Sequence, residues 1–277
     1  SSLVYSQSSI KFEHLSLEQG VSHNLVYCMY QDSVGLLWFG TLYGLVKYDG
    51  VSFTTIRHDP DDPNTLSNDD IVSLFEDSKR NLWIGTFGGG VNMYDRTGGR
   101  ITRYVSVSSD SKMIDLGTVW SIAEDNDGRI WMATNDNGAC VFDPLQSNFS
   151  FYRHNDADEG SLSNNAVVAI HKDAAGTMWL GTRGGGLNRY EPGAKGFAHY
   201  RYNKTDSTSL PSDFVRSLYT DRSGTLWVGT HSGGLAKYLR TTNSFARFSP
   251  NNGNGSNTRL SYVNTILQDT EGNMWVG

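Results

Sequence analysis

The chain has 277 residues and carries 23 Lys and Arg against 29 Asp and Glu, a formal net charge of −6. That balance argues against a nucleic-acid-binding surface, which needs a basic patch or stripe, and no apolar run of about 18 residues is present to span a membrane. Thirty glycines against six prolines, with no long apolar run at helical spacing, favour many short strands joined by tight turns. We therefore expect an all-β protein.

The chain opens with SSLVYSQSSIKFEH, which lacks the basic start and apolar core of a signal peptide. Six similar units follow, and we expect them to form a single domain over residues 1–277. We place five complete units and a partial sixth at residues 21–57, 67–105, 115–153, 163–202, 211–248 and 261–277.

Each unit is marked by a tryptophan, and successive tryptophans are 45 or 48 residues apart. An aspartate stands six residues before each tryptophan, and a glycine stands three before it in every copy except the second, which has Arg80. An aspartate at the head of a tight turn is expected to accept hydrogen bonds from the amides two and three residues on, and glycine supplies a positive φ. A tryptophan is large enough to fill the gap between neighbouring sheets. The repeated residues, which we expect to build the structure, are Asp32, Asp77, Asp125, Asp173, Asp221 and Asp269 with Trp38, Trp83, Trp131, Trp179, Trp227 and Trp275.

Each unit divides into four short strands. In the fourth unit the first strand is VVAIHKD (167–173), the tryptophan strand follows the turn, and the third and fourth strands are LNRY (187–190) and FAHYRY (197–202). Four antiparallel strands in about 48 residues, without a helix, are typical of a β-propeller blade. We predict a β-propeller of five complete blades and a partial sixth, belonging to a larger propeller that is seven-bladed or double.

Propeller geometry suggests three further features. The position ten residues before each tryptophan is small or slender, which lets the blades crowd together near the axis; its occupants are Cys28, Ser73, Ser121, Ala169, Ser217 and Thr265. Residues 10–15 (IKFEHL) are expected to form a lone outer strand, of the kind that joins the last blade to close a ring. An open ring exposes strand edges, so a homodimer that signals by rearranging is expected.

The repeat resembles that of the two-component regulator propeller family. The stretch VRSLYTDRSGTLWVGTHSGGLAKY (215–238) matches the family pattern almost throughout, whereas the third copy departs from it at Ala133 and at Asn135, Asp136 and Asn137. The resemblance implies a periplasmic, non-enzymatic sensor domain of a bacterial inner-membrane receptor. In that family the output is a histidine kinase, often a hybrid one, or a diguanylate cyclase, and some members sense glycans or their breakdown products. The membrane would be reached only through a segment outside this chain.

Function is expected at the mouth of the central channel. In an up-and-down blade the glycine loops and the links between blades lie on one face, and ligand sites use loops that vary between copies. Aromatic, basic, amide and acidic side chains there suit a polar small molecule, a glycan fragment or a periplasmic protein. The candidate ligand-binding residues are Tyr43, Phe87, Trp120, Asn135, Asp136, Arg183, Arg216 and His231. The alternative, that these are solvated residues that differ because nothing constrains them, stays open.

No residues are assigned to a catalytic site, a metal or a cofactor. Cys28 and Cys140 lack metal-ligand spacing and are expected to be buried and inert. The acidic segments 59–62 and 156–159 lie in equivalent links and are expected to be solvated loops rather than calcium sites. Two other functions stay open: a propeller lyase or hydrolase acting on a glycan, which needs converging carboxylates, histidines or tyrosines at the channel mouth, and a dimerisation scaffold without a ligand.

Overall fold

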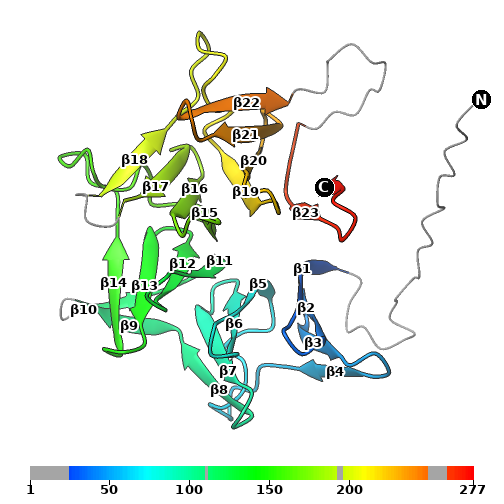
Figure 1. The fold of residues 1–277 in the computed structure, drawn as a ribbon. Coiled ribbons are helices and arrows are strands. Elements are labelled where there is room, and N and C mark those ends of the chain that lie inside the picture. The colour runs from blue at the N-terminus through cyan, green and yellow to red at the C-terminus, as the bar shows by residue number, and fades with distance from the viewer. Residues whose placement is uncertain (1–24, 110–111, 192–195, 249–260) are drawn as a thin grey trace, which may run out of the picture.

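The computed structural model describes residues 25–109, 112–191, 196–248 and 261–277, and it arranges their strands around a central axis (Figure 1). Within these ranges the chain contains no helix, so none of the described segments could cross a bilayer as a helix. The predicted all-β propeller is confirmed, whereas the lone strand expected at 10–15 lies outside the described residues.

Five four-stranded antiparallel sheets form the blades, and in each the strands pair in chain order. The first strand of each sheet lies nearest the axis and the fourth lies at the rim (Figure 1). The strands are β1 (Val26–Gln31), β2 (Leu37–Thr41), β3 (Gly44–Tyr48) and β4 (Phe53–Ile56); β5 (Ile71–Glu76), β6 (Leu82–Thr86), β7 (Val91–Asp95) and β8 (Arg100–Tyr104); β11 (Val119–Glu124), β12 (Ile130–Thr134), β13 (Ala139–Asp143) and β14 (Asn148–Tyr152); β15 (Val167–Lys172), β16 (Met178–Thr182), β17 (Leu187–Tyr190) and β18 (Phe197–Tyr200); and β19 (Val215–Thr220), β20 (Leu226–Thr230), β21 (Leu235–Leu239) and β22 (Ser244–Phe248).

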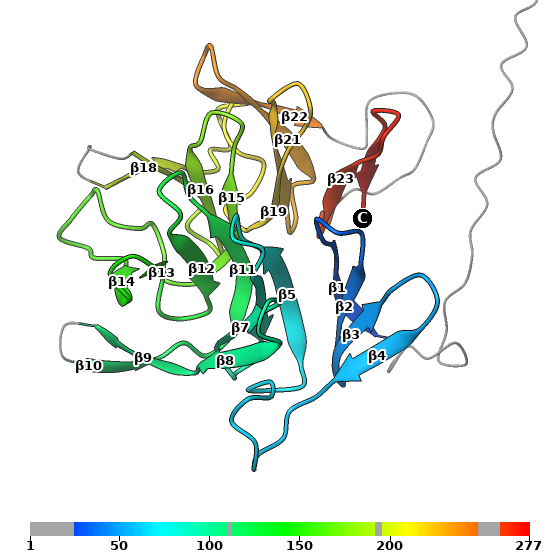
Figure 2. The same cartoon turned by 60° about the horizontal axis from the view of Figure 1, so that its bottom comes forward.

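A sixth, two-stranded sheet completes the arrangement around the axis. It pairs β23 (Ile266–Gln268) with β24 (Met274–Val276), and it lies beside β1 in both views (Figures 1 and 2). The innermost strands of the five blades and of this two-stranded sheet therefore surround one channel (Figure 1).

The link between the second and third blades contains a hairpin that the sequence pattern did not predict. β9 (Ser106–Ser109) pairs with β10 (Lys112–Asp115), and β9 contacts β14 at the rim (Figure 2). Val107 and Leu116 are buried in the same apolar cluster as Trp83. This link therefore adds apolar side chains to the core between the two blades.

The turn before each tryptophan strand is a closed hydrogen-bonded unit. In the first blade Asp32 Oδ1 accepts the amides of Val34 (3.1 Å) and Leu36 (2.9 Å), and Oδ2 accepts the indole N–H of Trp38 at 2.6 Å. The same three bonds recur in the other five copies. The prediction that the amide three residues on also donates to the aspartate side chain was wrong. That amide, on Gly35, donates instead to the main-chain oxygen of Asp32 at 3.0 Å.

The third residue after each of these aspartates has a left-handed backbone. Glycine occupies it in five copies, for example Gly224 with a φ of 82°, and Arg80 holds the same conformation in the second copy with a φ of 69°. The turn is thus kept even where the glycine is missing, although Arg80 must then adopt a backbone conformation that is unfavourable for residues with a side chain.

Adjacent blades are joined by the tryptophans and by the small residues near the axis. Trp38, Trp83, Trp131 and Trp179 are no more than 1% exposed, and Trp83 packs against Val119 of the next blade. Trp275 in the two-stranded sheet is 44% exposed. Small side chains near the axis do more than leave room, because the Ser73 hydroxyl donates to the main-chain oxygen of Val119 at 2.7 Å.

Candidate functional site

A cavity of about 480 Å³ lies at the centre of the ring, and every blade contributes to it. The residue directly before each small inner-strand residue lines this cavity, and the six are Tyr27, Val72, Trp120, Val168, Arg216 and Asn264. The innermost strands thus present one side chain each to a common space of the size that small-molecule sites have. Five residue types occupy these six positions, whereas the aspartate and the tryptophan are the same in every copy.

Asp70 and Phe214 also line the cavity, and neither is among the residues predicted to bind a ligand. Each lies two residues before the lining residue of its own strand, Val72 and Arg216. Side chains two apart on an extended chain point to the same side, so the two-residue period was a signal that could have found them.

The loops after the tryptophan strands supply the remaining lining residues, Phe87 and Arg183. Each loop is fixed by its main chain: the amides of Phe87 and Arg183 each donate at 2.9 Å to the main-chain oxygens of Asp70 and Ala166. Below the first loop, the Thr86 hydroxyl donates to the main-chain oxygen of Gly90 at 2.9 Å. Because these bonds use only backbone and the repeated threonine, the next side chain can vary without loss of the loop.

Of the eight residues predicted to bind a ligand, four line the cavity: Phe87, Trp120, Arg183 and Arg216. The other four do not line it. Asn135 lies next to it and its side-chain oxygen accepts the indole N–H of Trp120 at 3.3 Å, while Asp136 contacts Asn135 at 2.9 Å. Tyr43 lies on the loop of the first blade, where its amide donates to Thr41.

His231 lies behind the cavity wall. Its ring stacks on Phe214 at a centroid distance of 4.7 Å and meets Tyr262 edge-on at 4.6 Å. Its Nδ1 is buried without a hydrogen-bond partner. His231 therefore supports Phe214 from behind rather than facing the open space.

The two arginines of the cavity share one aromatic ring. The guanidinium groups of Arg183 and Arg216 lie 5.6 and 5.5 Å from the centroid of Phe214. Neither guanidinium has a carboxylate or hydrogen-bond partner among the described residues. Two unpaired positive charges are thus held at one side of the cavity.

The opposite side of the cavity is aromatic and carries one carboxylate. The rings of Phe87 and Trp120 meet edge-to-face at 6.0 Å. Asp70 has a buried Oδ1 without a hydrogen-bond partner, and burial raises the pKa of its carboxyl group. In the ring order, its blade lies across the axis from the blade of Arg216 (Figure 1).

The described residues do not assemble a metal site. No cluster of three metal-ligating side chains occurs among them, and the cavity lining holds Asp70 as its single carboxylate and no histidine. Burial raises the pKa of Cys28 to about 12 and also raises that of Cys140, so both thiols are protonated at neutral pH.

The acidic link at 59–62 is held in place by hydrogen bonds from Arg103. Arg103 donates to the main-chain oxygens of Asp59 (2.9 Å), Asp62 and Thr65. A guanidinium thus occupies the centre of this loop, where a cation would need the same oxygens. Arg247 holds the corresponding link before the fifth blade in the same way.

Three comparisons place this architecture among known proteins. The family model of the two-component regulator propeller matches six stretches, residues 20–43, 65–88, 114–136, 161–184, 209–232 and 259–277. Histidine kinase P4 of Formosa agariphila is 36% identical over 66 residues, which make up 24% of this chain and 5% of that kinase.

Solved structures share the fold at low sequence identity. The extracellular domain assigned to a hybrid two-component system of B. thetaiotaomicron has a TM-score of 0.73 at 22% identity, covering 96% of this chain and 40% of its own. PorZ, a surface component of the type-IX secretion system of Porphyromonas gingivalis, has a TM-score of 0.67 at 19% identity, covering 93% and 39%. Virginiamycin B lyase from Staphylococcus aureus has a TM-score of 0.67 at 12% identity, covering 91% and 76%. The chain thus spans about two-fifths of the first two of these structures.

Proposed function

Because the chain belongs to the two-component regulator propeller family, we propose that it is the extracytoplasmic ligand-sensing part of a bacterial signalling receptor. The observation that carries the proposal is the central cavity, whose lining residues vary between copies while the scaffold beneath them is repeated. Variable side chains on a repeated scaffold suit selective binding of a small molecule.

The receptor context of the proposal comes from similar proteins. A matched stretch of a histidine kinase and the fold shared with the extracellular domain of a two-component system support a periplasmic location and a kinase output. A diguanylate cyclase output belongs to the same proposal. Ligand binding would be passed on as a change between two packings of a receptor dimer.

Thermal unfolding in the presence of a library of metabolites and glycan fragments tests the binding role. A ligand that binds the folded state raises the midpoint temperature by mass action. We expect at least one compound to do so for the wild-type chain and to lose its effect in Phe87→Ala, since Phe87 lines the cavity and is 51% exposed.

Leu145→Ala is the matched control, because Leu145 is an apolar residue 84% exposed outside the cavity. It should leave the ligand effect intact. A library with no stabilising compound, or an effect equal in Phe87→Ala and wild type, would contradict the proposal and favour a scaffold without a ligand.

A glycan lyase or hydrolase is the second candidate, and it has less support. The likeness to virginiamycin B lyase is a likeness of fold. An acid–base mechanism needs paired titratable groups that converge on a substrate, and the described lining offers Asp70 alone beside two arginines.

A further inference from the structure

The unpaired arginines indicate the charge of the molecule that the cavity takes. Arg183 lies on the loop after β16 and Arg216 lies on β19, so the two come from neighbouring blades. Elsewhere in the described chain, arginines at blade boundaries are paired, as Arg96 is with Asp32 and Arg240 with Asp173, each at 2.7 Å. In a chain with a net charge of −6, two neighbouring cations without a partner form a site for an oxyanion.

Phe214 fixes the position of both cations. The guanidinium groups of Arg183 and Arg216 lie 5.6 and 5.5 Å from its ring centroid, and His231 stacks on the same ring. Stacking on an aromatic face leaves the N–H edges of a guanidinium free to donate. The pair is therefore held ready for two-sided donation to one anionic group.

Asp70 indicates which kind of group the bound molecule carries at the end opposite its anionic group. Its Oδ1 is out of contact with solvent and has no donor, an arrangement that costs free energy unless a partner arrives. Its location across the axis from Arg216 separates it from the cations. A hydroxyl or ammonium group of a bound molecule would supply the missing donor.

Phe87 and Trp120 indicate the shape of the bound molecule between its anionic end and its donor end. Their edge-to-face pair forms an aromatic wall beside Asp70, and Val72 and Val168 add aliphatic surface. Such a wall favours a ring with an apolar face over an extended polar chain.

We propose that the cavity binds a ring-containing acid, with its oxyanion between Arg183 and Arg216, its ring against Phe87 and Trp120, and a hydroxyl or ammonium donor on Asp70. This inference rests on the proposed sensor function, since it names the class of molecule that the sensor takes. Simple probes that carry these groups one at a time test each of the three contacts.

Four probes separate the contributions: cyclohexanecarboxylate bearing an aminomethyl, a hydroxymethyl or a methyl group opposite the acid, and the carboxamide of the methyl compound. Titration calorimetry with the whole chain should show the methyl acid binding roughly tenfold or more tightly than its amide. Arg183→Ala and Arg216→Ala should each remove this preference. Arg153→Ala should keep it, because Arg153 lies over Phe151 outside the cavity.

The donor end is tested with Asp70→Asn. In the wild type the aminomethyl or the hydroxymethyl acid should bind more tightly than the methyl acid, and the tighter of the two identifies the donor as ammonium or hydroxyl. Asp70→Asn should abolish the ammonium advantage while leaving the preference of acid over amide unchanged. Because the buried Oδ1 of Asp70 has no hydrogen-bond partner to lose and burying it costs free energy, this variant should unfold at the same temperature as the wild type or at a higher one.

Several results would overturn the inference: equal binding of acid and amide, a preference that survives in both arginine variants, or no binding of any probe. If no probe binds while the library still yields a compound whose effect is lost in Phe87→Ala, the inference fails and the sensor proposal stands. If the library also yields nothing, both fail.

Discussion

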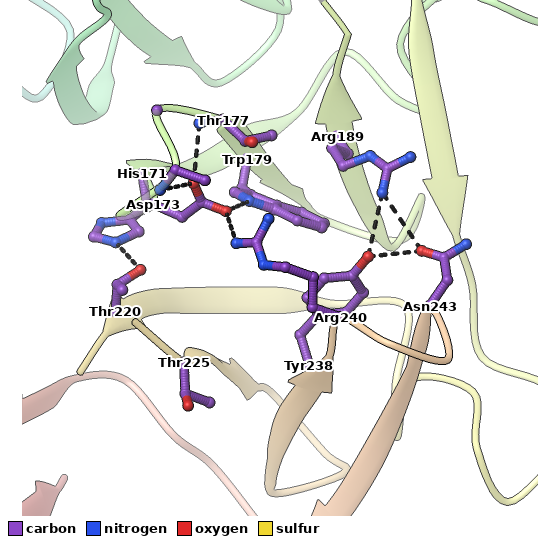
Figure 3. A network of polar contacts seen from close by, with 12 residues as sticks. His171, Asp173, Thr177, Trp179, Arg189, Thr220, Thr225, Tyr238, Arg240 and Asn243 are labelled. Carbon is purple, nitrogen blue, oxygen red and sulfur yellow. Dashed lines mark hydrogen bonds and ion pairs between the residues drawn. The ribbon is translucent and has the colours of Figure 1, made fainter. Parts of the chain in front are cut away.

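Arg240 and Asp173 are 67 residues apart in sequence, yet the guanidinium donates to the carboxylate at 2.7 Å across the boundary between the fifth and fourth blades (Figure 3). The same carboxylate oxygen accepts the indole N–H of Trp179 at 2.9 Å. One carboxylate thus closes its own turn, orients the tryptophan and binds the neighbouring blade.

Asp173→Asn should therefore destabilise the fold strongly. The substitution removes the negative charge beside Arg240 and places an amide where Trp179 and Arg240 both donate, and the site is buried. We expect a loss of roughly 2–4 kcal/mol in the free energy of unfolding, measured by urea denaturation. Asp269→Asn, at the equivalent place in the two-stranded sheet, should cost much less because Asp269 lies at the surface. Equal losses in the two variants would contradict this account.

Arg80→Gly should stabilise the chain. Arg80 holds a φ of 69°, which costs a side chain roughly 1–2 kcal/mol, and part of this strain is offset by the greater backbone entropy of glycine in the unfolded state. A gain of roughly 0.5–1 kcal/mol in unfolding free energy is expected. The reverse change, Gly224→Ala, should destabilise the chain through backbone strain, since the φ of Gly224 is 82°. No clash adds to this strain, because the added Cβ would meet only Ala174, at an ordinary contact distance of 3.7 Å. No gain in Arg80→Gly would show that the turn is not strained.

His171 should make the fold sensitive to mild acid. Burial lowers its pKa to about 4, although the nearby Asp173 carboxylate acts in the other direction. The ordinary value near 6.5 applies to the unfolded chain, so between pH 6.5 and 4 the unfolded state takes up a proton that the folded state does not. Stability should thus fall as the pH drops through this window, by up to roughly 3 kcal/mol. His171→Gln should flatten the curve there; parallel curves for variant and wild type would count against the prediction.

The chain should form dimers in solution. Met29 on β1 is 72% exposed and Leu267 on β23 is 57% exposed, and both belong to neighbouring innermost strands. Exposed apolar residues on strands favour pairing with a second copy. Light scattering at high concentration should give twice the mass of the chain, and Met29→Glu with Leu267→Glu should return it to the monomer. A monomeric mass for the wild type would refute the expectation.

The scaffold was predictable from sequence because its residues recur. The spacing of Asp173 and Trp179 fixes a turn and a strand wherever it appears, and the copies confirm one another. The hairpin at 106–115 was not predictable, since it occurs once and has no repeated counterpart.

The cavity was only half predictable for a related reason. Phe87 and Arg183 were identified because they follow a repeated threonine, whereas Asp70 and Phe214 precede the innermost strand and are marked only by their two-residue spacing from the lining residues of that strand. His231, the variable residue of its own loop, points to the back of Phe214 because its ring finds two aromatic partners there. Sequence position alone does not distinguish a residue that faces the channel from one that supports it.

The main-chain hydrogen bond that fixes Phe87 to Asp70 also bears on how this propeller can evolve. Because that bond uses neither side chain, single mutations can exchange the side chains while the loop keeps its main-chain bond. Duplication and recombination of blades along the gene can then bring new combinations of lining side chains to the channel.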